Sequence, residues 1–146
     1  MTDPARKSAT TSPLLSELAA PRPVAALGPV AARFVHSLRL IALHERVGRD
    51  PVPELAVRLG GVEIAARALA FSQAIAASWP ENVHVSRFCC CNLTHDEVTI
   101  GALVDCAWVR DRKGFEAQVE GLVRPDRIHR LWEGVLALVA AEARAL

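Results

Sequence analysis

The distribution of apolar residues along the chain predicts a protein built from α-helices. From residue 29 onward, apolar side chains recur every three or four positions, which is the spacing of one face of a helix. Proline and glycine residues divide this pattern into segments, because neither is favourable inside a helix. We therefore expect helices at 29–47, 51–59, 62–78, 94–112, 115–123 and 125–143.

The first predicted helix, 29–47, has a proline in its first turn and a glycine just past its end, which suits both positions. Three arginines, Arg33, Arg39 and Arg46, fall largely outside its apolar stripe. The stripe consists of Val30, Phe34, Leu38, Ile41 and Val47.

Two parts of the chain depart from helical spacing. Residues 1–26 hold four prolines and several serines and threonines, which predicts a disordered, flexible tail with at most a short helical turn at 14–20. Residues 83–88 alternate and predict a short extended segment, which must lie across the helices or pair with another chain. The expected fold class is all-α: one compact bundle of about five to six helices at 27–146, preceded by the tail.

Composition narrows the class of protein without indicating an activity. The chain has 146 residues, enough for one domain. It has 17 basic and 16 acidic residues, so it lacks the excess of positive charge that is typical of nucleic-acid-binding proteins. Residues 1–12 are polar, so we expect no secretory signal there, and the longest apolar run, 135–141, is too short to span a bilayer. We therefore expect a cytoplasmic protein with no membrane partner, whose four cysteines are not structural disulfides.

Three consecutive cysteines, Cys89, Cys90 and Cys91, are the most unusual feature of the sequence. They stand just before Thr94 and Glu97, which form the pattern of a capping box at the start of the helix expected at 94–112. Arg87 is close in sequence, and the positive end of the helix dipole is nearby; both favour thiolate over thiol. One hypothesis is therefore a redox-responsive site formed by Cys89, Cys90, Cys91 and Arg87.

A second hypothesis for the cysteines is a metal centre. Zinc and iron–sulfur clusters need four converging thiolate or imidazole ligands, and the candidates are Cys89, Cys91, His84 and His95. The spacing matches no paired C-x-x-C signature, so we expect no cofactor, with zinc or an iron–sulfur cluster as the alternative. In a third, structural interpretation the cysteines act as small hydrophobic residues that pack the entry into the helix.

Residues 51–78 offer a different kind of site. A short helix, a Gly60-Gly61 turn and a second helix are typical of a helix-turn-helix DNA-binding motif. The DNA-recognition helix of such a motif should expose basic and polar side chains toward the bases. Few residues of the second helix could do so: Glu63, Arg67, Ser72 and Gln73. Two packed helices joined by glycines explain the segment better, so nucleic acid is not the expected partner.

The stretch from Cys89 to Glu97, followed by two amphipathic helices, resembles a group of short bacterial helical proteins of unknown function. Members carry a cysteine-rich turn, then Leu or Met, Thr and an acidic pair before a helix, as in Leu93-Thr94-His95-Asp96-Glu97. The likeness covers residues 83–146. It implies a helical fold and supplies no activity.

Plentiful apolar helices without convergent polar chemistry favour a binding module over an enzyme. We expect a small protein-binding or regulatory module whose partner is another protein, with a second copy of the chain as one candidate. The alternatives are a thiol-redox or metal sensor that uses the Cys89–Cys91 turn, and a helix-turn-helix regulator that uses residues 51–78.

Overall fold

In a computed structural model, which describes residues 20–146, the chain folds into six α-helices and one small two-stranded ladder. The helices are α2 (Pro29–Arg46), α3 (Val52–Leu59), α4 (Val62–Ser78), α5 (His95–Trp108), α6 (Arg112–Val119) and α7 (Pro125–Arg144). The strands are β1 (Arg22–Pro23) and β2 (Asn92–Leu93), and a 3-10 turn, η1 (Val24–Ala26), follows β1. The expected all-α bundle is confirmed.

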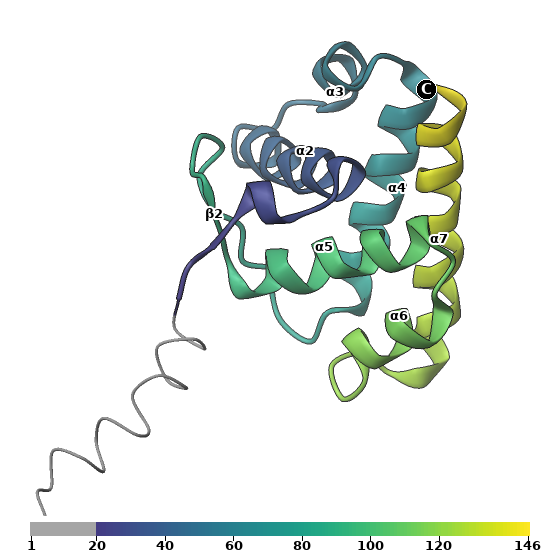
Figure 1. The fold of residues 1–146 in the computed structure, drawn as a ribbon. Coiled ribbons are helices and arrows are strands. Elements are labelled where there is room, and N and C mark those ends of the chain that lie inside the picture. Colours follow the sequence, from purple (N-terminus) through teal and green to yellow (C-terminus); the bar gives the residue numbers. More distant parts are fainter. Residues whose placement is uncertain (1–19) are drawn as a thin grey trace, which may run out of the picture.

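The helices pack in two main pairs. The long helices α4 and α7 run side by side, while α2 packs against α5 (Figure 1). The short helix α3 packs on α4, and α6 packs against both α5 and α7. No helix in the described part of the chain is both long and apolar enough to cross a membrane.

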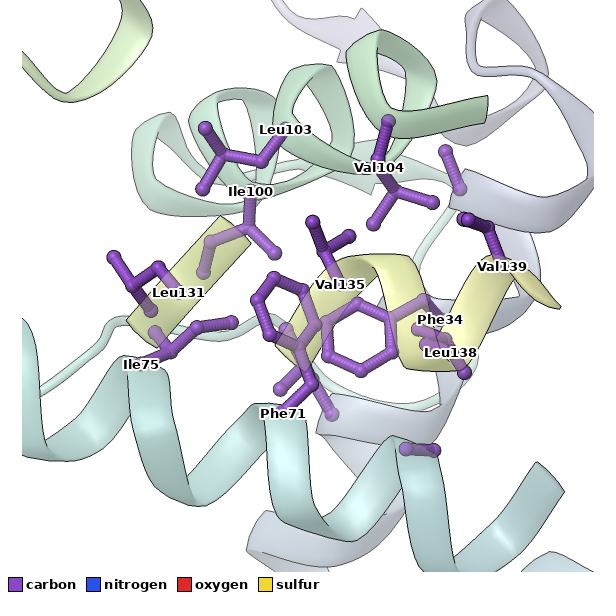
Figure 2. Packing of buried hydrophobic residues seen from close by; sticks show 14 of the residues in the cluster. Phe34, Phe71, Ile75, Ile100, Leu103, Val104, Leu131, Val135, Leu138 and Val139 are labelled. Atoms are coloured by element: carbon purple, nitrogen blue, oxygen red, sulfur yellow. The ribbon is translucent and has the colours of Figure 1, made fainter. Parts of the chain in front are cut away.

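The core lies where α2, α4, α5 and α7 meet. Phe34 of α2 and Phe71 of α4 meet in its centre in a tilted arrangement, with ring centroids 4.9 Å apart and aliphatic side chains around them (Figure 2). Both rings are at most 2% exposed, and burying each stabilises the fold by roughly 1.5–3 kcal/mol. Gly101 of α5 lets Leu27 approach closely, since a Cβ at Gly101 would come within 2.7 Å of the Leu27 side chain.

Helix boundaries follow the sequence pattern except between α5 and α6. The expected helix 94–112 ends at Trp108, and the expected helix 115–123 is shifted to Arg112–Val119, so Gly114 lies inside it. Arg110 takes the left-handed conformation with φ 60°, which stops α5. The Asp111 side chain then accepts a hydrogen bond from the Gly114 N–H at 2.9 Å and caps α6.

The expected boundary of the N-terminal tail was placed too late. Residues 22–26, assigned to the tail, are part of the fold: Arg22 and Pro23 pair antiparallel with Leu93 and Asn92, and Val24 is 9% exposed. The sequence could not indicate this because a two-residue strand has no periodicity. The prediction for 1–19, which includes most of the helical turn at 14–20, concerns residues outside the described range.

The segment expected to be extended at 83–88 was predicted either to lie across the helices or to pair with another chain. It lies across the helices. Residues 82–87 have no regular secondary structure, and Val83 and Val85 pack against the core. The ladder forms further on, at Asn92 and Leu93, with β1 of the same chain as its partner.

Four residues of the apolar stripe expected on 29–47 face the core as predicted. The fifth, Val47 at its end, does not, because it is 64% exposed. The interpretation of Arg39 as lying outside the buried face is also wrong, because Arg39 is 2% exposed. Helix α2 is covered on nearly all sides between Phe34 and Ile41, and Arg39 is enclosed there with a carboxylate from another helix.

Candidate functional site

The three cysteines form the tip of a loop between Trp79 and α5. A tight turn closes the loop, in which the Cys90 N–H donates to the Arg87 carbonyl at 3.0 Å. Arg87 thus contributes a backbone group to the cysteine turn, defined here as residues Arg87–Asn92. The strand β2 follows directly and leads into α5.

Beneath the cysteine turn lies a buried ion pair between Arg39 of α2 and Glu97 of α5. The Arg39 Nε atom is 2.7 Å from Glu97 Oε2, and Nη2 is 2.9 Å from Oε1, so the contact is bidentate. Both side chains are fully shielded from solvent. The hydrogen bonds that Arg39 donates to Glu97 help to raise the pKa of Arg39, which keeps the guanidinium charged.

The remaining donors of Arg39 fix the backbone of the cysteine turn. Nη1 donates to the Cys90 carbonyl at 2.6 Å, and Nη2 also donates to the Asn92 carbonyl at 2.9 Å. The carbonyl between them, that of Cys91, accepts from the Val24 N–H at 2.8 Å. Three consecutive carbonyls are therefore held from within the fold by Arg39 and Val24.

Glu97 joins this network to the start of α5. As predicted, Thr94 and Glu97 form a capping box: the Glu97 N–H donates to Thr94 Oγ1 at 3.1 Å, and the Thr94 N–H donates to Glu97 Oε1 at 2.8 Å. The Ser86 N–H donates to Oε2 at 3.3 Å. Burial by itself would raise the pKa of Glu97. The hydrogen bonds that it accepts from Arg39, Thr94 and Ser86, together with the Arg39 charge, outweigh burial and lower the pKa.

The first half of the loop is tied to the first turn of α5 by Asp96. Its Oδ2 accepts from the His84 N–H at 2.8 Å and its Oδ1 from Trp79 Nε1 at 3.3 Å. Thr94 Oγ1 donates to the His84 carbonyl at 2.6 Å. Both ends of the loop are thus attached to the same helix terminus, which leaves the tip projecting.

The thiols differ in their exposure. Cys89 and Cys91 are exposed, whereas Cys90 between them and Cys106 on α5 are partly buried, and all four are free. Burial raises the pKa of the Cys106 thiol, and the charges of Asp111 and Asp105 raise it further. The chain therefore presents two accessible thiols at the turn and holds a less accessible one in the bundle.

The structure does not gather the candidate metal ligands around one point. The histidines are both exposed, and His84 contributes backbone contacts to the loop while His95 begins α5. Among residues 20–146, no three His, Cys, Asp or Glu side chains are placed to hold one ion. A zinc or iron–sulfur site at Cys89, Cys91, His84 and His95 stays a prediction that would require the loop to rearrange.

The helix-turn-helix hypothesis also stays a prediction. Helices α3 and α4 form the expected pair, and Gly60 ends α3 in the left-handed conformation with φ 84°. Two of the four candidate contact residues are engaged within the chain: Glu63 pairs with Arg144, and the buried Ser72 hydroxyl donates to the Leu69 carbonyl at 2.7 Å. Arg67 remains exposed.

Sequence reasoning missed Arg39 as part of the site. A signal was present: Arg39 stands inside the run from Phe34 to Ile41, in which apolar residues occupy every side of the helix and leave no polar face for a charge. The acidic residue of the capping box was the available partner. Nothing local to either residue indicated that α2 and α5 pack together.

Comparison with known proteins adds no functional information: no family model, no curated protein and no solved structure matches the chain. The resemblance to short bacterial helical proteins stays a prediction.

Proposed function

We propose that this chain is a small regulatory, protein-binding module whose cysteine turn presents thiols to a partner and responds to their oxidation. The observation that carries the proposal is the contrast within the turn: Cys89 and Cys91 are exposed, while the backbone is held by buried Arg39. Free cysteine behaves as a small hydrophobic residue and is usually buried. Two exposed thiols on a fixed turn favour contact or reaction over packing.

Thiol–disulfide exchange is the reaction that suits this arrangement. The thiolate of Cys89 or Cys91 attacks one sulfur of a disulfide, a new S–S bond forms and the old one breaks. The departing thiolate takes up the proton that the attacking thiol released, and the incoming disulfide supplies the oxidising equivalents. The product is a mixed disulfide at the tip of the loop, which adds bulk to the contact surface and changes what it binds.

Oxidised glutathione provides a direct test on the folded chain. We expect mixed disulfides on Cys89 and Cys91, located by peptide mass mapping, while Cys106 reacts much more slowly. Its partial burial limits access, and its raised pKa leaves less thiolate to react. Modification is expected to leave the helical circular dichroism unchanged, because the turn is held through its backbone.

Two variants compare the reactivity of the thiols in the cysteine turn with that of Cys106. Cys106→Ser should react like the unmodified chain, whereas the double variant Cys89→Ser, Cys91→Ser should lose most of the reaction. Equal rates at Cys106 and at the turn would contradict the proposal, as would labelling that requires denaturant.

The binding part of the proposal is tested with a second copy of the chain as the first candidate partner. Native mass is measured before and after treatment with oxidised glutathione. We expect the monomer–dimer distribution to change in the unmodified chain and to stay constant in the double serine variant. A distribution that is unaffected by glutathionylation in both proteins would reject regulation of self-association through this turn.

A further inference from the structure

A small pocket lies between α2, α3 and the residue that precedes the cysteines. Its volume is about 290 Å³, at the lower end of the range of small-molecule sites. Three buried leucines, Leu40, Leu55 and Leu59, make its lining largely apolar. The other lining residues are Arg33, His36, Ser37, Arg58 and Phe88.

Two guanidinium groups border this pocket. The Arg33 side chain is 46% exposed, and its contacts in the described part of the chain all use Nη2, which donates to the Leu59 carbonyl at 3.1 Å and pairs with Glu142 at 3.4 Å. The Arg58 side chain is 50% exposed and reaches Glu54 through Nε and Nη2. Because an arginine has five N–H donors, both guanidinium groups keep donors for a ligand.

Among residues 20–146, no carboxylate lines the pocket. The acidic partners of the two arginines, Glu142 and Glu54, are not among its lining residues, and Glu54 also contacts His44 at 2.9 Å. Burial lowers the pKa of His36, and the charge of Arg39 lowers it further, so this imidazole is neutral near pH 7. The positive charge at the pocket therefore comes from Arg33 and Arg58.

Phe88 contributes the aromatic side chain of the pocket lining. The guanidinium carbon of Arg58 lies 4.8 Å from the centre of the Phe88 ring, and the His36 ring meets the same ring edge-on at 6.0 Å. These contacts hold the ring in place beside the leucines. A flat or branched apolar group could pack against the ring, with a polar end toward the arginines.

We infer that this pocket binds a small monocarboxylate with an aromatic or branched apolar body. Guanidinium groups recognise carboxylates in a bidentate manner, and the leucines and Phe88 would cover the apolar body. The volume admits roughly one ring with its carboxyl group and excludes a long chain. This site is independent of the proposed thiol reaction, although Phe88 directly precedes Cys89.

Benzoate is the probe for this site, and benzamide is its uncharged counterpart of nearly the same shape. We expect saturable shifts of the backbone NMR signals around His36, Arg58 and Phe88 when benzoate is added to the full chain. Benzamide should bind about tenfold more weakly, which corresponds to about 1.4 kcal/mol. Equal affinity for the two compounds, or shifts that do not saturate, would overturn the inference.

A matched pair of variants separates the pocket from a general charge effect. Arg58 and Arg112 are both half-exposed, both pair with a glutamate four residues on or back, and both lie over an aromatic ring, but only Arg58 lines the pocket. Arg58→Gln should weaken benzoate binding about tenfold, whereas Arg112→Gln should leave it unchanged. An equal loss in both variants would contradict the proposal.

Two further variants keep the result interpretable. Phe88→Ala should also weaken benzoate binding, so the test does not depend on one arginine. The double variant Cys89→Ser, Cys91→Ser should bind benzoate like the unmodified chain while losing glutathionylation, which separates failure of this site from failure of the proposed function. Unchanged binding in both Arg58→Gln and Phe88→Ala would place the benzoate elsewhere and reject the pocket.

Discussion

Arg39 and Glu97 are 58 positions apart in the sequence and form a bidentate ion pair, with Nε–Oε2 and Nη2–Oε1 distances of 2.7 and 2.9 Å. Both side chains are fully buried, and the pair shares its remaining hydrogen bonds with the backbone of the cysteine turn and of Ser86 and Thr94. A buried ion pair seldom adds net stability relative to an apolar pair, but loss of one partner is costly. Its role here is to fix where the cysteine turn lies.

Replacing Arg39 should destabilise the fold strongly. Arg39→Met leaves the Glu97 carboxylate buried without its counter-ion and leaves the Cys90 and Asn92 carbonyls without their donor. We expect a loss of about 3–5 kcal/mol in the free energy of unfolding, measured by urea denaturation. Arg46→Met, on the exposed end of the same helix, should change it by less than about 0.5 kcal/mol. Similar losses in the two variants would show that Arg39 acts only as a generic helix residue.

Two buried glutamates should change the free energy of unfolding with pH in opposite directions. The pKa of Glu97 is lowered from its ordinary 4.5. Its contribution to stability is therefore complete at neutral pH and is lost as the pH falls below 4.5 and through the folded-state pKa. Burial raises the pKa of Glu142 above 4.5 despite the Arg33 charge, so its contribution is complete below 4.5 and is lost as the pH rises through the folded-state pKa.

Glutamine variants test these signs. Glu97→Gln should be less stable than the native chain at pH 7, with a difference that shrinks in acid. Glu142→Gln should be more stable at pH 7 and equal to the native chain near pH 4, because the amide resembles the protonated carboxyl. Urea denaturation at the two pH values measures both differences, and a common direction for the two variants would contradict the assignment.

The capping box should be worth about one hydrogen bond at the entry to α5. Thr94→Ala removes the acceptor of the Glu97 N–H and the donor to the His84 carbonyl, and should cost about 1 kcal/mol. Thr99→Ala, which removes only a 3.3 Å bond to the preceding turn, should cost less than about 0.5 kcal/mol. Faster hydrogen exchange at the Glu97 amide in Thr94→Ala alone would support the capping role, and unchanged exchange would count against it.

The turn between α5 and α6 should accept glycine. Arg110 has φ 60°, a conformation that costs a residue with a Cβ more than it costs glycine, so Arg110→Gly should stabilise the fold by about 0.5–1 kcal/mol. Ala117→Gly, at an exposed position inside α6, should instead cost about 1 kcal/mol. Thermal unfolding of the two variants would show shifts of opposite sign, and a loss of stability in Arg110→Gly would mean that its side chain makes a contact worth more than the strain.

The periodic apolar residues determined the helices, and local chemistry determined several of their ends. Thr94 and Glu97 marked the start of α5 because a capping box needs only residues three apart, and Gly60 marked the end of α3 because it tolerates a positive φ. The end of α5 was misplaced because Arg110, unlike glycine, gives no sequence signal for the left-handed conformation.

The cysteine turn was recognisable from sequence as an unusual feature, but only the tertiary structure decided what holds it. The ion pair between Arg39 and Glu97, the pairing of β1 with β2, and the pocket that joins Arg33 and Arg58 to Phe88 all connect segments that are far apart in the chain. Local propensity acts over a few residues, whereas these contacts depend on how α2 packs against α3 and α5. The sequence by itself therefore determined the helices and the cysteine turn, and their packing determined which charges are buried and which thiols reach solvent.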